Sequence, residues 1–312
     1  MTSSAARSPA SNASATTTPA PNESAPVCLG PQPTSVPRSP LPPGTCDTHF
    51  HVFGEAARYP LDPRRNYTPS VCALAQYREV MRACGIERAV LVQPSVYGTD
   101  NSQLLDALRE GGAAFRGIVV PRADIGDDEL EAMHALGVRG IRLNLVNPQV
   151  LSIDAALALA ARTKRLGWHL QVHVALHMPD SDALLERIAA RSQVPLVVDH
   201  MGRPSPGAPA PRSLLGLVES GRAWVKLSAA YRISRSGPPD FADVLPLVRS
   251  LIDANSERLL WGSDWPHSEL FATPPRTADL VDLLPAWLPD EALRRLVCVD
   301  NPARLYGYSD AA

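Results

Sequence analysis

Short apolar segments alternate with segments of helical spacing from residue 44 to the end of the chain. The apolar segments are rich in Val, Leu and Ile and are bounded by turn-forming residues, which is typical of buried strands. Between them, apolar residues recur three and four positions apart, as in amphipathic helices. The pattern predicts eight strands, at residues 45–51, 89–93, 116–120, 140–144, 169–174, 196–200, 223–228 and 259–262. It predicts helices at residues 74–84, 102–110, 127–136, 153–166, 181–191, 241–255, 277–284 and 290–297.

Strands that alternate with helices predict an α/β fold with a parallel sheet, because parallel neighbours need long, right-handed crossover connections. A closed barrel and an open, doubly wound sheet both fit this order. Eight strands in a region close to the roughly 250 residues typical of TIM barrels favour a (β/α)8 barrel. The first predicted strand is not followed by GxGxxG, which argues against a dinucleotide-binding sheet.

Residues 1–43 differ in composition from the rest of the chain. They contain ten of the 31 prolines, and most other positions are Ser, Thr or Ala. Such a segment buries too little apolar surface to offset the entropy lost on ordering. We therefore expect a disordered tail at residues 1–43 and one barrel domain at residues 44–312.

Composition narrows the class of protein. The net charge is −2, 45% of residues are hydrophobic and 20% are charged, as in ordinary soluble proteins. Without a block of like charge or a long apolar run, we expect no nucleic-acid or membrane partner. Five scattered cysteines without a CxxC pair, and no apolar leader, favour a reduced, cytoplasmic protein. The sequence does not decide whether the chain forms a homo-oligomer.

Polar residues stand where four of the predicted strands end. The first, fifth, sixth and eighth strands lead, in that order, into His49 and His51, His173, His200, and Asp264. The carboxyl ends of the strands in such a barrel meet at one mouth, where active sites lie. We therefore expect these five side chains to converge.

Their chemistry suggests a metal site. His49 and His51 are two positions apart, so their side chains share one face of a strand and can reach the same ion. With His173 and Asp264 they provide three nitrogens and one oxygen, a ligand set that suits Zn2+. The hypothesis is one zinc ion bound by His49, His51, His173 and Asp264.

Three segments carry a resemblance to a known family. They are CDTHFHVFG at 46–54, VDHMGRP at 198–204 and WGSDWPH at 261–267. The chain resembles the amidohydrolase-2 branch of the amidohydrolase superfamily from about residue 44 to Tyr306. Within that branch it is similar to the 2-pyrone-4,6-dicarboxylate hydrolases and the sulfomuconolactone hydrolases.

The resemblance implies hydrolysis of a small anionic lactone. In that mechanism Asp264 activates the attacking water and His200 polarises the scissile carbonyl. The residues at the substrate-contacting positions are Tyr67, Ser95, Arg142, Arg203 and Arg232. Arginine also suits this task physically, because its planar fork pairs with a carboxylate or sulfonate through two hydrogen bonds.

Two departures from the pyrone hydrolases shape the prediction. Those enzymes work without metal and carry a tyrosine near the end of the fifth strand, where this chain has His173. They also carry a second arginine after the fourth strand, where this chain has Asn147 and Pro148. Both departures favour a zinc-dependent lactonase of the sulfomuconolactone type.

Other functions fit the same motifs. One alternative is a metal-free 2-pyrone-4,6-dicarboxylate hydrolase, and another is a lactone isomerase or decarboxylase on the same barrel. A ligand-binding barrel without catalysis is disfavoured, because five ionisable side chains at buried strand ends are costly without a task.

Overall fold

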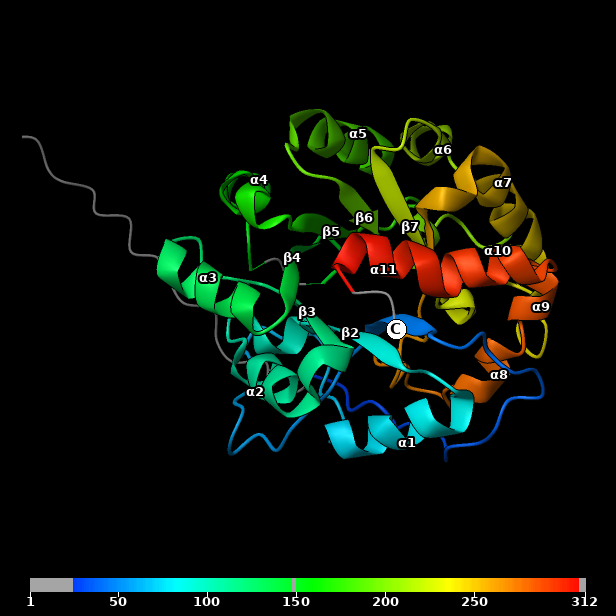
Figure 1. Ribbon diagram of the computed structural model, residues 1–312, viewed down its shortest axis with the longest axis horizontal. Coiled ribbons are helices and arrows are strands. Elements are labelled where there is room, and N and C mark those ends of the chain that lie inside the picture. The colour runs from blue at the N-terminus through cyan, green and yellow to red at the C-terminus, as the bar shows by residue number, and fades with distance from the viewer. Residues whose placement is uncertain (1–24, 148–149, 309–312) are drawn as a thin grey trace, which may run out of the picture.

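The computed structural model describes residues 25–147 and 150–308. Its eight strands are all parallel and hydrogen-bond in sequence order from β1 to β8 (Figure 1). They are β1 Cys46–Phe50, β2 Arg88–Val92, β3 Phe115–Val119, β4 Val138–Asn144, β5 His169–His173, β6 Leu196–Val198, β7 Ala223–Leu227 and β8 Leu259–Trp261. Each predicted strand is present, with ends that differ by at most two residues.

The sheet closes where the chain leaves β8 and passes β1. The amide of Asp264 donates to the carbonyl of His49 at 2.9 Å, and the amide of His51 donates to the carbonyl of Trp265 at 2.8 Å. Gly262 directly follows β8 and faces β1, because a Cβ atom there would lie 2.8 Å from His49 Cβ. The barrel prediction is therefore confirmed, and the open doubly wound sheet is wrong.

The helices surround the barrel in Figure 1. The α-helices are α1 Leu74–Cys84, α2 Ser102–Gly111, α3 Asp127–Ala135, α4 Ile153–Thr163, α5 Ser181–Arg191, α6 Arg212–Glu219, α7 Leu245–Asn255, α8 Thr277–Val281, α9 Leu284–Trp287, α10 Glu291–Arg295 and α11 Asn301–Tyr306. The pattern missed α6 and α11, which are short, and it merged α8 with α9. Within the described ranges, no helix has the length and apolar character needed to cross a membrane.

The C-terminal residues fill the barrel end opposite the mouth. In Figure 1, α11 lies across the front of the strands. The Tyr306 ring packs edge-on against His169, at the start of β5, with centroids 5.3 Å apart. The Tyr308 hydroxyl donates to the carbonyl of Ala89, near the start of β2, at 2.9 Å. These residues cover the amino ends of the strands, so a functional site is expected at the carboxyl ends.

Part of the segment expected to be a tail packs against the barrel. The amide of Cys28 donates to the carbonyl of Thr68 at 2.8 Å, and Ala25 and Cys28 are buried. The described structure therefore differs from the prediction for residues 25–43. The prediction for residues 1–24 lies outside the described residues.

Candidate active site and metal centre

His49 and His51 come from β1 and the residue after its end, and both side chains enter the barrel mouth. They are 0% and 4% exposed. Asp264 follows β8 and is also buried, with a left-handed backbone φ of 59°. A non-glycine residue in that region stores strain, which is common where a side chain must point in one functional direction.

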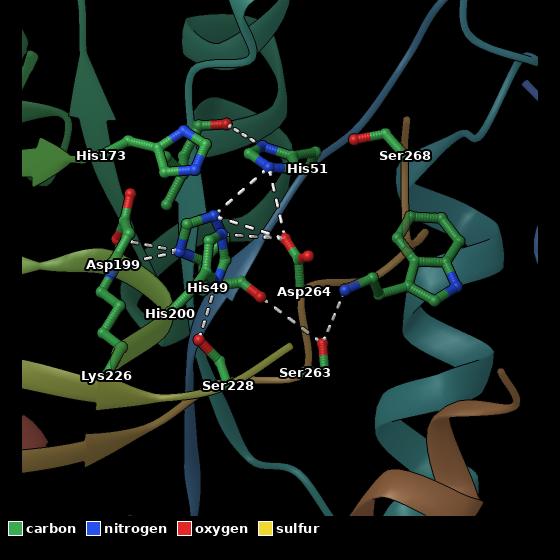
Figure 2. Close-up of polar contacts among 12 residues, drawn as sticks. His49, His51, His173, Asp199, His200, Lys226, Ser228, Ser263, Asp264 and Ser268 are labelled. Atoms are coloured by element: carbon green, nitrogen blue, oxygen red, sulfur yellow. Dashed lines mark hydrogen bonds and ion pairs between the residues drawn. The ribbon is translucent and has the colours of Figure 1, made fainter. Parts of the chain in front are cut away.

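Three atoms from these residues form a donor cluster: His49 Nε2, His51 Nε2 and Asp264 Oδ1. The two histidine nitrogens are 3.3 Å apart, and Asp264 Oδ1 lies 3.6 Å from His49 Nε2 and 3.8 Å from His51 Nε2. Tetrahedral zinc with bonds of 2.0–2.2 Å requires ligand atoms about 3.3 to 3.6 Å apart. Figure 2 shows the side chains converging, and their spacing fits a divalent ion.

Neighbouring groups orient both imidazoles. His51 Nδ1 lies 2.7 Å from the carbonyl oxygen of Val92, which only accepts, so Nδ1 carries the proton and Nε2 keeps its lone pair. His49 Nδ1 lies 3.2 Å from Asp199 Oδ1, an arrangement found behind many metal-bound histidines. Burial lowers the pKa of each imidazole to about 3, so both are neutral, as ligands must be.

His200 approaches the cluster from a short 3-10 turn rather than from a strand. Strand β6 ends at Val198, and His200 has φ 51°, which turns the chain sharply. Its Nδ1 lies 2.8 Å from Ser228 Oγ, and its Nε2 lies 3.7 Å from Asp264 Oδ1. Burial lowers the pKa of His200 well below its usual value, so the ring is neutral. The prediction that strand 196–200 carries it was wrong by two residues.

His173 ends β5 and lies beside the cluster without belonging to it. Its ring centroid is 5.2 Å from that of His200. Arg203 Nη1 lies 3.4 Å from its Nε2, and its Nδ1 is buried without a hydrogen-bond partner. The structure therefore does not bring His173 into a donor group with His49, His51 and Asp264, and its role as the fourth ligand stays a prediction. Among described residues, the other close donor group joins His49 to Asp199 and His200.

The second oxygen of Asp264 faces a tyrosine that the sequence analysis missed. The Tyr231 hydroxyl donates to Asp264 Oδ2 at 2.5 Å, and Arg232 Nε donates to the same oxygen at 3.3 Å. Burial raises the pKa of Asp264, but the permanent charge of the Arg232 guanidinium and the neighbouring imidazoles hold it well below its usual value. The carboxylate is thus ionised and fixed, with Oδ1 toward the donor cluster.

The arginine cluster (Arg142, Arg203 and Arg232) surrounds this centre. Arg142 is 4% exposed and pairs with Asp199 at 3.7 Å. Arg232 pairs with Asp264 at 3.3 Å, and Arg203 reaches His173 as described above. The structure therefore brings all three predicted arginines to the same mouth.

Tyr67 and Ser95 lie on the β1 and β2 side of the mouth. Tyr67 is 3% exposed, and burial raises its pKa. Hydrogen bonds with Ser268 and Ser95 oppose this shift without reversing it. Ser95 also lines a small cavity with Arg142. These two residues thus join the arginine cluster at the mouth.

A buried polar network lies beneath the donor cluster. Lys226 Nζ on β7 donates to Gln171 Oε1 at 2.7 Å and lies 3.4 Å from Asp199 Oδ1. Gln171 Nε2 donates to Asp199 Oδ2 at 3.1 Å. The sequence analysis assigned no role to Lys226. A charged residue at an inward-facing position of a predicted strand is nevertheless a signal of a buried polar network. The network holds the carboxylate that faces His49.

Comparison with known proteins supports the motif-based resemblance. The sequence profile of the Amidohydrolase family matches residues 46–308. The chain is 40% identical over 296 residues to a 4-sulfomuconolactone hydrolase of Hydrogenophaga intermedia, covering 91% of this chain and 96% of the relative. It is 35% identical to a 2-pyrone-4,6-dicarboxylate hydrolase of Comamonas testosteroni, covering 87% and 93%. A crystal structure from Agrobacterium tumefaciens superposes with a TM-score of 0.77 at 28% identity, covering 88% and 100%.

Proposed function

The chain belongs to the Amidohydrolase family, and from this premise we propose that it hydrolyses a small anionic lactone with a divalent metal ion, zinc, at the barrel mouth. The observation that carries the proposal is the spacing of the donor cluster. Three donor atoms 3.3 to 3.8 Å apart, two of them on neutral imidazoles, match the needs of a tetrahedral ion. His173 is the fourth proposed ligand.

A bound zinc ion would supply an activated water, because it lowers the pKa of that water from 15.7 to about 7. The proton of the attacking water would pass to Asp264. Tyr231 and Arg232 hold Asp264 Oδ2, so Oδ1 stays directed toward the reacting centre. The same carboxyl group would return the proton to the ring oxygen as the lactone opens.

His200 would stabilise the oxygen of the lactone carbonyl. When Ser228 donates to His200 Nδ1, the proton of the neutral ring is on Nε2, which faces Asp264 and the mouth. A donor fixed in this way acts where negative charge develops on the carbonyl oxygen.

The arginine cluster supports an anionic substrate. Arg142, Arg203 and Arg232 would bind its carboxylate or sulfonate, and Tyr67 and Ser95 would donate to its remaining oxygens. The relatives at 40% and 35% identity are named as hydrolases of 4-sulfomuconolactone and of 2-pyrone-4,6-dicarboxylate, both anionic cyclic esters. We propose a sulfomuconolactone or muconolactone type of substrate, met in the breakdown of aromatic compounds.

A panel of lactones tests this function. Muconolactone, sulfomuconolactone, pyrone dicarboxylate and sugar lactones are incubated with the purified protein, with and without zinc, and products are identified by mass. We expect ring opening, with a gain of one water, for an anionic lactone and its loss in Asp264→Asn. Isomerised product, carbon dioxide release, or no turnover of any lactone would contradict the proposal.

A further inference from the structure

The strap segment, residues 25–28, pairs with the loop that carries Tyr67 from β1 to α1. A parallel bridge joins the strap segment to Thr68. The amide of Cys28 donates to the carbonyl of Thr68, and the amide of Thr68 donates to the carbonyl of Pro26, both at 2.8 Å. Thr68 directly follows Tyr67, so this pairing fixes the backbone beside a proposed substrate-binding residue.

Side chains of the loop add to this pairing. Thr68 Oγ1 donates to the carbonyl of Ala25 at 3.2 Å, and Ser70 Oγ donates to the carbonyl of Cys28 at 2.9 Å. The strap segment lies in the stretch whose composition predicts a disordered tail. These contacts show instead that it is joined to the mouth.

The Cys28 side chain reaches a second loop, the one after β8. Burial raises the pKa of Cys28, and a hydrogen bond from the Glu269 backbone amide opposes that rise. The preceding residue, Ser268, hydrogen-bonds with Tyr67, and its carbonyl accepts from Arg232 Nη2 at 2.6 Å. The strap segment therefore contacts both loops that hold Tyr67, one through its main chain and the other through its thiol.

The chain after the strap segment is anchored to the layer of helices. The amides of Arg38 and Ser39 donate to Asp282 Oδ1 at 2.8 and 3.1 Å, and Arg38 Nε donates to Asp282 Oδ2 at 3.0 Å. Asp282 directly follows α8. The strap segment is thus connected to a fixed point on the outer helices, as an element that positions a loop must be.

We propose that the strap segment is a positioning element of the active site: it holds the Tyr67 hydroxyl where that group donates to an oxygen of the substrate. A donor that is already held in place loses less conformational freedom on binding, so its contact contributes more to affinity. The effect of the strap segment on binding passes through Tyr67. The inference rests on the proposed function for the identity of the substrate.

Cys28→Pro tests this inference, because proline lacks the amide proton that bonds the Thr68 carbonyl. We expect KM for the lactone to rise about three- to tenfold, the effect of one weakened hydrogen bond. The values of kcat and metal content should stay within about twofold of wild type, since a contact made equally in ground and transition states affects KM alone. Ser70→Ala removes a bond to the strap segment without changing the backbone and should raise KM about twofold.

Leu29→Pro is the matched control for Cys28→Pro. Leu29 is 51% exposed, and among the described residues its amide has no hydrogen-bond partner. Proline there should leave KM unchanged. An equal rise of KM in Leu29→Pro, or an unchanged KM in both Cys28→Pro and Ser70→Ala, would overturn the inference.

Tyr67→Phe distinguishes positioning from a general loss of packing. Phenylalanine keeps the ring and removes the hydroxyl, so Cys28→Pro should have no further effect on KM in that background. A double-mutant cycle on KM measures this coupling. Additive rises of KM in the two single variants would contradict a role that passes through Tyr67.

Binding of isophthalate, an unreactive ring dicarboxylate, separates this inference from the proposed function. Calorimetric titration of the full-length variants measures its affinity without turnover. If Cys28→Pro weakens isophthalate binding about three- to tenfold but no lactone is opened, the positioning role stands and the lactonase proposal fails. If a lactone is opened while neither KM nor isophthalate affinity changes in Cys28→Pro, the lactonase proposal stands and the strap segment is only structural. No binding of isophthalate to wild type, together with no lactone opening, would overturn both.

Discussion

The imidazole of His173 is the proposed ligand whose contacts differ most from those of the other three. His49, His51 and Asp264 already approach one another at ligand spacing, whereas His173 Nε2 lies 3.4 Å from a guanidinium nitrogen of Arg203. A neutral imidazole is needed at a metal, and burial lowers the pKa of His173 well below its usual value. The ring therefore has the protonation state of a ligand.

Replacing His173 with Ala tests that role. Loss of a ligand should weaken metal binding by more than the roughly 10- to 100-fold that loss of an outer partner costs. Metal content after dialysis against a weak chelator is the measurement. His177→Ala removes an exposed imidazole from the following loop and should retain the ion. A His173→Ala protein that keeps metal and rate would limit the ligands to the donor cluster.

Individual residues also show which parts of the site can be predicted from the sequence. The two-residue spacing of His49 and His51 dictates a shared face, so their convergence could be predicted. The role of Tyr231 could not be predicted, because it depends on a loop whose path no local pattern sets. Asp264 Oδ2 meets Tyr231 only after the β7 and β8 segments have packed together.

At the scale of elements, the sequence predicts where each strand lies better than it predicts where each strand ends. Every predicted strand exists because runs of Val, Leu and Ile set its position, yet the exact ends depend on ladder hydrogen bonds with neighbours. That is why His200, predicted to end a strand, lies in a turn with positive φ. Helix α6 was missed because it is short, contains Gly216 and follows a proline-rich segment.

Closure of the barrel at Gly262 connects the fold to the site. A Cβ atom at Gly262 would lie 2.8 Å from His49 Cβ and 3.0 Å from the His49 backbone nitrogen. Gly262→Ala should therefore push apart the segments that carry His49 and Asp264. We expect a loss of about 1–3 kcal/mol in the free energy of unfolding, measured in urea, together with reduced metal content.

Gly216→Ala is the matched control for that change. Nothing lies within 4 Å of a Cβ at Gly216, which is in the exposed part of α6. Alanine should stabilise this helix by about 0.5–1 kcal/mol. If Gly262→Ala were equally harmless, the close approach of β8 to β1 would not be needed to form the site.

At the scale of the whole molecule, the polar side chains inside the barrel make its stability depend on pH. His169 illustrates this at the end away from the mouth: it is 1% exposed, and neither ring nitrogen has a hydrogen-bond partner. Burial lowers its pKa to about 3, from 6.5 in an unfolded chain. Between these values only the unfolded state binds the proton, so the free energy of unfolding decreases as pH falls.

His169→Leu should remove this dependence. From pH 7 to pH 5, wild type should lose about 2 kcal/mol more free energy of unfolding than the variant, measured by urea denaturation at each pH. Parallel losses in the two proteins would mean that His169 keeps an ordinary pKa in the folded state.

The central claim is that the barrel mouth holds one divalent ion that the reaction requires. The direct measurement is metal content by mass spectrometry, together with the rate of lactone opening, before chelation, after chelation and after zinc is restored. The account predicts one ion per chain, loss of both ion and rate on chelation, and recovery of both with zinc. A protein freed of metal that opens the lactone at its full rate would contradict it.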